Sequence, residues 1–219
     1  YTCLIENEDC EEQILTPGMD DEIFSRTKVP MTKNEVRVLS ISRLELTKKA
    51  VVYDVGSGTG SVSVECARLS PDIVVFAIEQ KEEAANLTKE NAVRLGLSDQ
   101  IMVINKKAPE GFEELPTPTH VFIGGSSGAL GDILSAIQKK LIVKEKTKGV
   151  RVVINAVSLE TIAQITKLIQ TYPVKHVQLT QIQASRAHRL GSYNLMQAQN
   201  PVLIASFNLL PDDKMEADE

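Results

Sequence analysis

Residues 54–60 read Asp-Val-Gly-Ser-Gly-Thr-Gly and connect a short apolar run to a segment with the apolar pattern of a helix. The run that contains Val51–Val55 is typical of a buried strand, and the following helix is predicted over residues 61–69. Three glycines within five residues let the backbone turn tightly and approach a ligand with no side chain in between. This strand–loop–helix unit predicts a nucleotide-type site in an α/β fold.

The spacing of the glycines indicates which nucleoside the loop accepts. Dinucleotide sites use G-x-G-x-x-G, but Ser61 stands at the third glycine's position and Gly60 comes one residue early. The G-x-G-x-G form preceded by Asp54 indicates S-adenosylmethionine, which has no pyrophosphate. Glu79 ends the next apolar run, nineteen residues after Gly60, where its carboxylate can accept hydrogen bonds from both ribose hydroxyls. The alternative is a glycine-rich turn beside a surface glutamate.

Length and composition limit the class of protein. At 219 residues the chain is long enough for one α/β domain with a large core. We expect neither a signal peptide nor a membrane span. The net charge of −5 and the lack of a long basic run argue against a dedicated nucleic-acid binder. A reducing cytosol and no metal site are expected, because the cysteines and histidines are scattered: Cys3, Cys10, Cys66, His120, His176 and His188.

Apolar periodicity and turn residues predict strands that alternate with helices. Thr32 and Glu35 form a candidate capping box for a helix that continues to Leu46. Gly96 is a candidate left-handed residue after a helix over 81–95. Further helices are predicted at 129–141 and 158–170, and further strands at 73–78, 101–104, 120–123, 150–155, 174–184 and 201–209. The expected fold is α/β, a doubly wound, mostly parallel seven-stranded sheet with a reversed last strand.

Four segments together resemble a known family: residues 26–37, the 54–60 loop, the Phe-Ile-Gly-Gly-Ser-Ser-Gly stretch at 122–128, and Gln-Ala-Gln-Asn-Pro-Val at 197–202. The chain is similar over about residues 20–209 to the precorrin C15-methyltransferase (decarboxylating) family of cobalamin biosynthesis. These are class I, Rossmann-like methyltransferases that use S-adenosylmethionine. The resemblance implies methylation of a precorrin at C15 with decarboxylation of its C12 acetate, a cytoplasmic location and a homotetramer.

The resemblance also bears on the domain organisation. In many organisms this unit is the C-terminal half of a polypeptide whose N-terminal half methylates C5 of the same ring. Residues 1–22 begin with Tyr1 and become acidic and rich in turns, which favours a linker or the tail of such an upstream domain. A processed terminus is the alternative. Residues 23–219 are then the predicted methyltransferase domain.

The resemblance implies contacts with S-adenosylmethionine at Thr32, Gly56, Ser57, Gly58, Thr59, Gly60, Glu79 and Ala108. Thr32 offers a hydroxyl, although capping a helix is an equally good role for it. Ala108 would contribute its backbone near the adenine. The family commonly has an acidic residue just before this alanine, whereas this chain has Lys107. A side-chain hydrogen bond to the adenine amino group is therefore in doubt.

A precorrin is a flat macrocycle with acetate and propionate side chains, so an acidic protein must supply local cations for it. Arg186 and Arg189, near a predicted chain reversal, are candidates because guanidinium groups bind carboxylates well. The alternative is that they are solvated surface charges. Gly124, Gly125 and Ser126 could approach the ring face, or they could form an ordinary turn into a helix. No general acid or base is identified from these residues.

Two other functions remain open at this stage. One is a class I methyltransferase for another substrate, such as a tRNA base, which should show a basic face or an added binding domain. The other is a non-catalytic scaffold that keeps the nucleotide fold, which should show decay of the glycines or of Glu79. Neither feature is present in the sequence.

Overall fold

A seven-stranded sheet forms the centre of the molecule, in the order β3-β2-β1-β4-β5-β9-β6. The computed structural model describes residues 16–142 and 149–212. In these ranges β9 runs antiparallel to both β5 and β6, and the strands from β3 to β5 are parallel. The predicted sheet with a reversed last strand is therefore confirmed. Its strands are β1 (Val51–Val55), β2 (Val74–Ile78), β3 (Ile101–Ile104), β4 (His120–Ile123), β5 (Val150–Ala156), β6 (Val174–Ile182) and β9 (Val202–Leu209).

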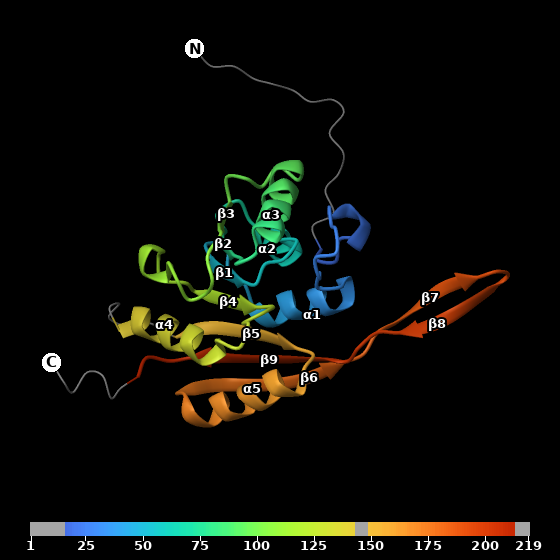
Figure 1. Cartoon of the computed structure of the whole chain (residues 1–219). Helices are drawn as coiled ribbons and strands as arrows, with labels where there is room; N and C mark the ends of the chain where they lie inside the picture. The colour runs from blue at the N-terminus through green and yellow to red at the C-terminus, as the bar shows by residue number, and fades with distance from the viewer. Residues whose placement is uncertain (1–15, 143–148, 213–219) are drawn as a thin grey trace, which may run out of the picture.

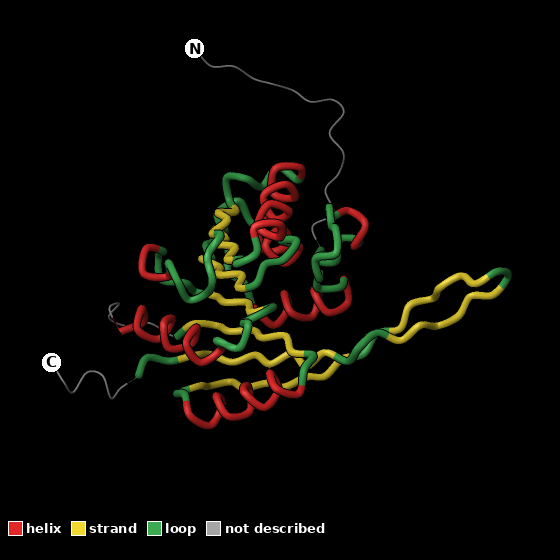
Figure 2. Tube along the Cα trace, viewed as in Figure 1, coloured by secondary structure: helices red, strands yellow, loops and turns green. Residues whose placement is uncertain are grey.

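Helices cover both faces of this sheet (Figures 1 and 2). The helices α1 (Asn34–Leu44), α2 (Ser61–Ala67) and α3 (Glu82–Arg94) pack on one face, and α4 (Leu130–Ile142) and α5 (Leu159–Thr171) pack on the other. Two 3₁₀ turns, η1 (Asp21–Ile23) and η2 (Phe112–Glu114), lie in connecting segments. The arrangement is the expected doubly wound one.

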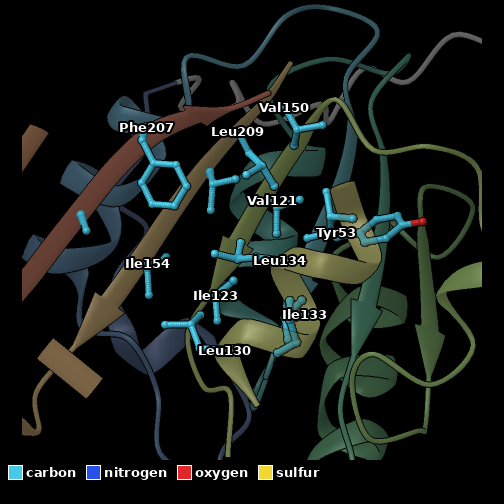
Figure 3. Packing of buried hydrophobic residues seen from close by; sticks show 14 of the residues in the cluster. Tyr53, Val121, Ile123, Leu130, Ile133, Leu134, Val150, Ile154, Phe207 and Leu209 are labelled. Carbon is cyan, nitrogen blue, oxygen red and sulfur yellow. The ribbon is translucent and has the colours of Figure 1, made fainter. Parts of the chain in front are cut away.

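Alternate residues of the central strands fill two separate cores. Tyr53 of β1 points to the α4 side, where it packs in one cluster with Leu130 and Leu134 (Figure 3). Its neighbour Val52 points to the α1 and α2 side. Because a strand turns successive side chains to opposite faces, a strand covered by helices on both sides must be apolar throughout. The buried Tyr53 hydroxyl donates a hydrogen bond to the Pro116 carbonyl at 2.8 Å.

The sequence analysis missed a hairpin between the last two strands of the sheet. The predicted strand over 174–184 is β6, and the chain then forms β7 (Ser185–Leu190) and β8 (Tyr193–Ala198), which among the described strands pair only with each other. The hairpin extends away from the sheet (Figure 1). Large apolar side chains are exposed on it, so neither face gives the alternation of a half-buried strand, which is why the pattern was not recognised.

The helix α1 begins one residue later than the capping box requires. Lys33, not Thr32, is the residue before the first turn, and no side chain of the predicted box caps it. The Asn34 amide instead donates to the Asp21 carboxylate at 3.1 Å, so a residue thirteen positions away provides the cap. By contrast Gly96, the second residue after α3, is left-handed as predicted, with φ of 69°.

The segment just before η1 was predicted as linker, but its described part is held against the body of the domain. The amides of Gly18 and Met19 donate to the buried Glu65 carboxylate of α2 at 2.8–3.1 Å. Asp21 is buried as well. Residues 1–15, which carry the rest of the linker or upstream-tail prediction, lie outside the described residues.

Candidate active site

A cavity of about 800 Å³ opens at the carboxyl ends of the parallel strands. Val55, Ile78 and Asn155, at or near the ends of β1, β2 and β5, are among its lining residues. Strand order reverses between β1 and β4, and ligands of doubly wound sheets bind at that point. The volume is in the range of small-molecule sites.

The glycine loop between β1 and α2 forms one wall of the cavity, and its glycines are required by close backbone contacts. Gly56 and Gly58 have φ of 73° and 60°. A Cβ on Gly56 would lie 2.6 Å from the Gly125 carbonyl oxygen, and one on Gly58 would lie 2.9 Å from the Pro30 carbonyl oxygen. The loop is therefore pressed between residues 124–125 and the segment 28–33, which we call the strap.

Glu79 is fixed across this loop by backbone donors. Its Oε2 accepts a hydrogen bond from the Gly58 amide at 3.1 Å, and its Oε1 accepts one from the Lys81 amide at 2.9 Å. The residue is 8% exposed and lines the cavity. Each carboxylate oxygen keeps a further lone pair, so the group can accept two more hydrogen bonds from a ligand.

The structure brings most of the predicted site residues together. The cavity is lined by Thr32, Gly56, Ser57, Gly58, Glu79, Ala108, Gly124, Gly125 and Ser126. Thr59 and Gly60, at the end of the loop, are not among the lining residues; both are buried, and Gly60 precedes α2. Arg186 and Arg189 are not among the lining residues. Arg186 is paired with Glu35 and Asp21, so the cavity gives no support to a substrate-binding role for these two arginines.

Sequence reasoning missed several polar residues of the lining. Lys33, Lys81, Lys106 and Asn155 all line the cavity. Lys81 and Lys106 closely follow predicted strands, and Asn155 ends one. Their position at the carboxyl ends of strands is the signal that could have identified them. Asn155 is fixed by its hydrogen bond to the Ser40 hydroxyl at 2.9 Å.

The family model for a precorrin methyltransferase domain matches residues 22–208. The chain belongs to the precorrin methyltransferase family. This family member is 40% identical over 191 residues to a probable cobalt-precorrin-6B C(15)-methyltransferase (decarboxylating) of Pyrobaculum calidifontis, covering 86% of this chain and 94% of that protein. It is 32% identical over 199 residues to the protein of that name from Saccharolobus solfataricus, covering 90% and 98%.

Solved structures agree with this assignment. The precorrin methyltransferase chain superposes on precorrin-6y C5,15-methyltransferase from Geobacter metallireducens with a TM-score of 0.79 and 31% identity, covering 88% of this chain and 96% of that one. Precorrin 8W decarboxylase of Methanobacterium thermoautotrophicum gives 0.77 and 31%, covering 87% and 100%. A tRNA (m1A58) methyltransferase of Aquifex aeolicus, covering 90% and 76%, gives 0.65 at 16% identity and shares only the fold.

Beneath the glycine loop of this precorrin methyltransferase lies a buried carboxyl group. Asp54 is 1% exposed and accepts a hydrogen bond from the Ser63 hydroxyl through Oδ2. Within the described residues its Oδ1 has no partner, and neither has the buried Thr59 hydroxyl. Burial raises the pKa of Asp54 from 3.8 to about 6, because the ionised form loses its hydration.

The raised pKa of Asp54 makes folding stability depend on pH. The folded state holds the proton more tightly than the unfolded state, so this residue's contribution falls as pH rises from about 4 to about 6. Asp54→Asn cannot ionise. We expect its free energy of unfolding, relative to wild type, to increase by about 1–3 kcal/mol between about pH 4 and about pH 7. Denaturant titrations measure it, with the exposed Asp72→Asn as control. Parallel pH curves for wild type and Asp54→Asn would contradict the assignment.

Proposed function

We propose that this chain methylates a precorrin at C15 and decarboxylates its C12 acetate, with S-adenosylmethionine as methyl donor. The observation that supports this most strongly is a single cavity that combines the glycine loop, Glu79 and a cluster of lysines. The relatives named above as C(15)-methyltransferases (decarboxylating) support the same reaction. A tRNA base is the weaker alternative, since the likeness to the tRNA enzyme is one of fold alone.

The residues at the carboxyl ends of β1 and β2 fit S-adenosylmethionine. Glu79 would accept from the ribose hydroxyls, because its carboxylate is already oriented by two amides. The backbone of Gly56 and Gly58, which both line the cavity, would lie against the amino-acid part. Ala108 would lie near the adenine, and Thr32 faces the same cavity. When bound, S-adenosylmethionine supplies an electrophilic methyl group.

The charge of the cavity fits a substrate with many carboxylates. Although the chain has a net charge of −5, five lysines line the cavity against two glutamates, Glu79 and Glu83. Glu79 is engaged with backbone amides and Glu83 accepts from the Thr27 hydroxyl at 2.6 Å. Of the described lysines here, Lys33 and Lys106 are paired with carboxylates, at 3.8 and 3.7 Å. The others form no ion pair in the described residues: Lys28, Lys81 and Lys107.

The chemistry that the chain itself must perform is mainly positioning. The electron-rich ring carbon is the nucleophile, and the conjugated ring can accept the electrons released by loss of carbon dioxide. The protein then has to hold the ring in line and keep water away. Gly124 and Gly125 leave room for the ring face, and Ser126 and Ser127 offer hydroxyl donors beside it.

The setting of the enzyme follows from the same proposal. In the described ranges, every helix is too short or too polar to cross a membrane, and we keep the cytoplasm as the expected location. A solved relative is the C-terminal domain of precorrin-6Y C5,15-methyltransferase from Rhodobacter capsulatus, which supports fusion to a C5-methyltransferase domain. Assembly into a homotetramer remains a prediction, supported by the exposed apolar side chains on the hairpin: Leu190, Tyr193, Leu195 and Met196.

The cofactor assignment predicts that binding depends on Glu79. Glu79→Ala removes a charge-assisted ribose contact, which should weaken S-adenosylmethionine binding by about 10- to 150-fold, or roughly 1.5–3 kcal/mol. Isothermal titration calorimetry measures the affinity, and Glu90→Ala on the exposed side of α3 is the matched control. NAD should show no saturable binding. Unchanged affinity in a folded Glu79→Ala variant would refute this cofactor assignment.

The substrate assignment predicts that the unpaired lysines act together. Replacing Lys28, Lys81 and Lys107 with Gln should weaken binding of a polycarboxylate porphyrin by about 10-fold at low salt, because each partly exposed ion pair contributes up to about 1 kcal/mol. The effect should shrink as salt rises, and the affinity for S-adenosylmethionine should hardly change. The control replaces Lys48, Lys49 and Lys175, which are exposed outside the cavity. Equal losses in the two triple variants would show only a general charge effect.

A shared pocket for both reaction steps predicts that Gly125→Val lowers both together. A Cβ on Gly125 meets nothing within 4 Å, and its φ lies outside the left-handed region, so the fold should survive. The added side chain would reduce the space in the cavity on the side that faces the ring. Mass spectrometry of the product follows methyl gain and carbon dioxide loss, and Gly131→Val, outside the cavity, is the control. A variant that decarboxylates normally without methylating would show that the steps are separable.

A further inference from the structure

Arg186, at the base of the hairpin, binds two acidic residues near the N-terminal end of the described chain. Its Nε and Nη2 donate to the two carboxylate oxygens of Glu35 at 2.8 and 2.6 Å, and its Nη1 donates to Asp21 at 2.8 Å. The hydrogen bond from Arg186 lowers the pKa of Glu35. This fork–fork geometry is the strongest form of an arginine–carboxylate pair. Three of the five guanidinium N–H groups are therefore donated to carboxylates of the protein.

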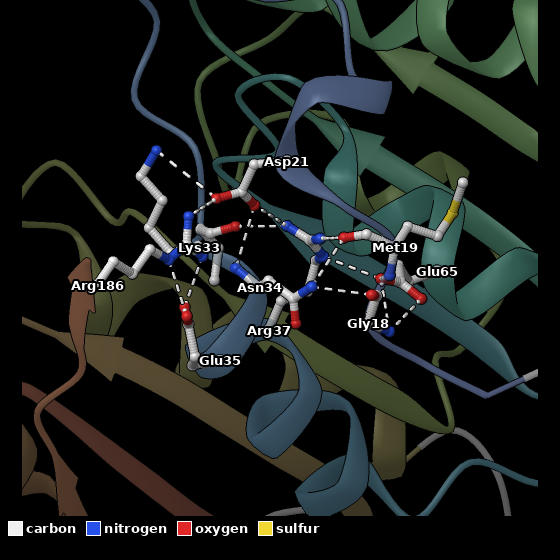
Figure 4. Close-up of polar contacts among 10 residues, drawn as sticks. Gly18, Met19, Asp21, Lys33, Asn34, Glu35, Arg37, Glu65 and Arg186 are labelled. Atoms are coloured by element: carbon white, nitrogen blue, oxygen red, sulfur yellow. Dashed lines mark hydrogen bonds and ion pairs between the residues drawn. The ribbon is translucent and has the colours of Figure 1, made fainter. Parts of the chain in front are cut away.

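Asp21 connects Arg186 to a second, buried arginine. Its other oxygen accepts from Arg37 Nη1 at 3.2 Å, and Arg37 is fully buried. Arg37 also donates to Glu65 at 3.0 Å and to the carbonyl oxygens of Thr32, at 2.7 Å, and Met19. Figure 4 shows these contacts converging on Asp21 and Glu65. We call these five charged residues the clamp: Asp21, Glu35, Arg37, Glu65 and Arg186.

The clamp holds the C-terminal end of the strap, the segment that covers the glycine loop. Arg37 binds the Thr32 carbonyl there, and Asp21 accepts from the amide of Asn34, the residue that follows the strap. The strap lines the cavity along its whole length, and its Pro30 carbonyl packs against Gly58. Glu65 belongs to α2, the helix that leaves the glycine loop. A movement of the strap would therefore change the wall on which the cofactor lies.

We infer that Arg186 is a positioning residue for the cofactor side of the cavity: by binding Asp21 and Glu35 it fixes the strap against the glycine loop. This inference rests on the proposed function only for the identity of the cofactor. Arg189 lies three residues further along the same strand and provides a comparison. Its Nε donates to the Gly191 carbonyl at 3.3 Å, and the residue is exposed. The two arginines therefore have separate roles.

The test compares Arg186→Ala with Arg189→Ala in the full chain. Calorimetry should show S-adenosylmethionine affinity weakened by about 3- to 10-fold in Arg186→Ala, since the pairs are partly exposed, and unchanged in Arg189→Ala. Hydrogen exchange of the strap amides in the ligand-free protein should be faster only in Arg186→Ala. Arg186→Lys keeps the positive charge but cannot form the bidentate pair. It should therefore restore part of the cofactor affinity and part of the exchange protection. In turnover the KM for S-adenosylmethionine should rise with kcat nearly constant.

Glu35→Gln provides an independent arm, because it removes the same pair from the other side. Its effect and that of Arg186→Ala should be less than additive in the double variant. If the wild-type protein fails to bind S-adenosylmethionine, the cofactor assignment is refuted. Hydrogen exchange of the strap amides then remains as the measurement that tests the clamp. Normal strap exchange and normal cofactor affinity in Arg186→Ala would overturn the inference. Weaker porphyrin binding in the same variant would then indicate that Arg186 binds the substrate.

Discussion

A guanidinium with no exposed surface determines how this site is built. Arg37 is surrounded by the Asp21 and Glu65 carboxylates and two backbone carbonyls, and its Cζ lies over the Phe24 ring, 4.9 Å from the ring centroid. A charge removed from water is tolerated only when its donors are satisfied, and loss of one partner of a buried pair costs about 3–5 kcal/mol. The segment before α1, the start of α1 and α2 must therefore stay together. The wall of the cavity is a consequence of that requirement.

The same cavity shows that global charge and local charge are separate properties. A net charge of −5 argues against an anionic partner, yet lysines outnumber carboxylates around the cavity. Field lines concentrate in a cleft with low-dielectric walls, so a few cations at its edge outweigh many acids elsewhere. The charge of the Glu79 carboxylate is stabilised by its two backbone amide donors. An acidic enzyme can therefore attract a polycarboxylate substrate.

The sequence predicted those parts of the fold and site that depend on local pattern. The strand, glycine loop and helix around Gly58 follow from residue order, and Glu79 follows from the end of the next strand. The prediction that Thr32 caps α1 was wrong, because Asp21, distant in sequence, accepts the hydrogen bond from the first amide of the helix. Arg186 was predicted to bind the substrate, because the sequence around it does not reveal its partner Glu35, 151 residues away. Long-range pairs between charged side chains leave no periodic signal, whereas apolar burial does.

The position of β9 has a consequence for synthesis. This strand lies between β5 and β6, and it hydrogen-bonds to both along nearly its full length. Until residues 202–209 leave the ribosome, β5 has an unpaired edge and β6 has no neighbour in the sheet. Unpaired apolar edges invite association with other chains, and pairings distant in sequence form slowly. The nascent chain is thus open to such association until β9 is made, although the cofactor half of the sheet is already complete.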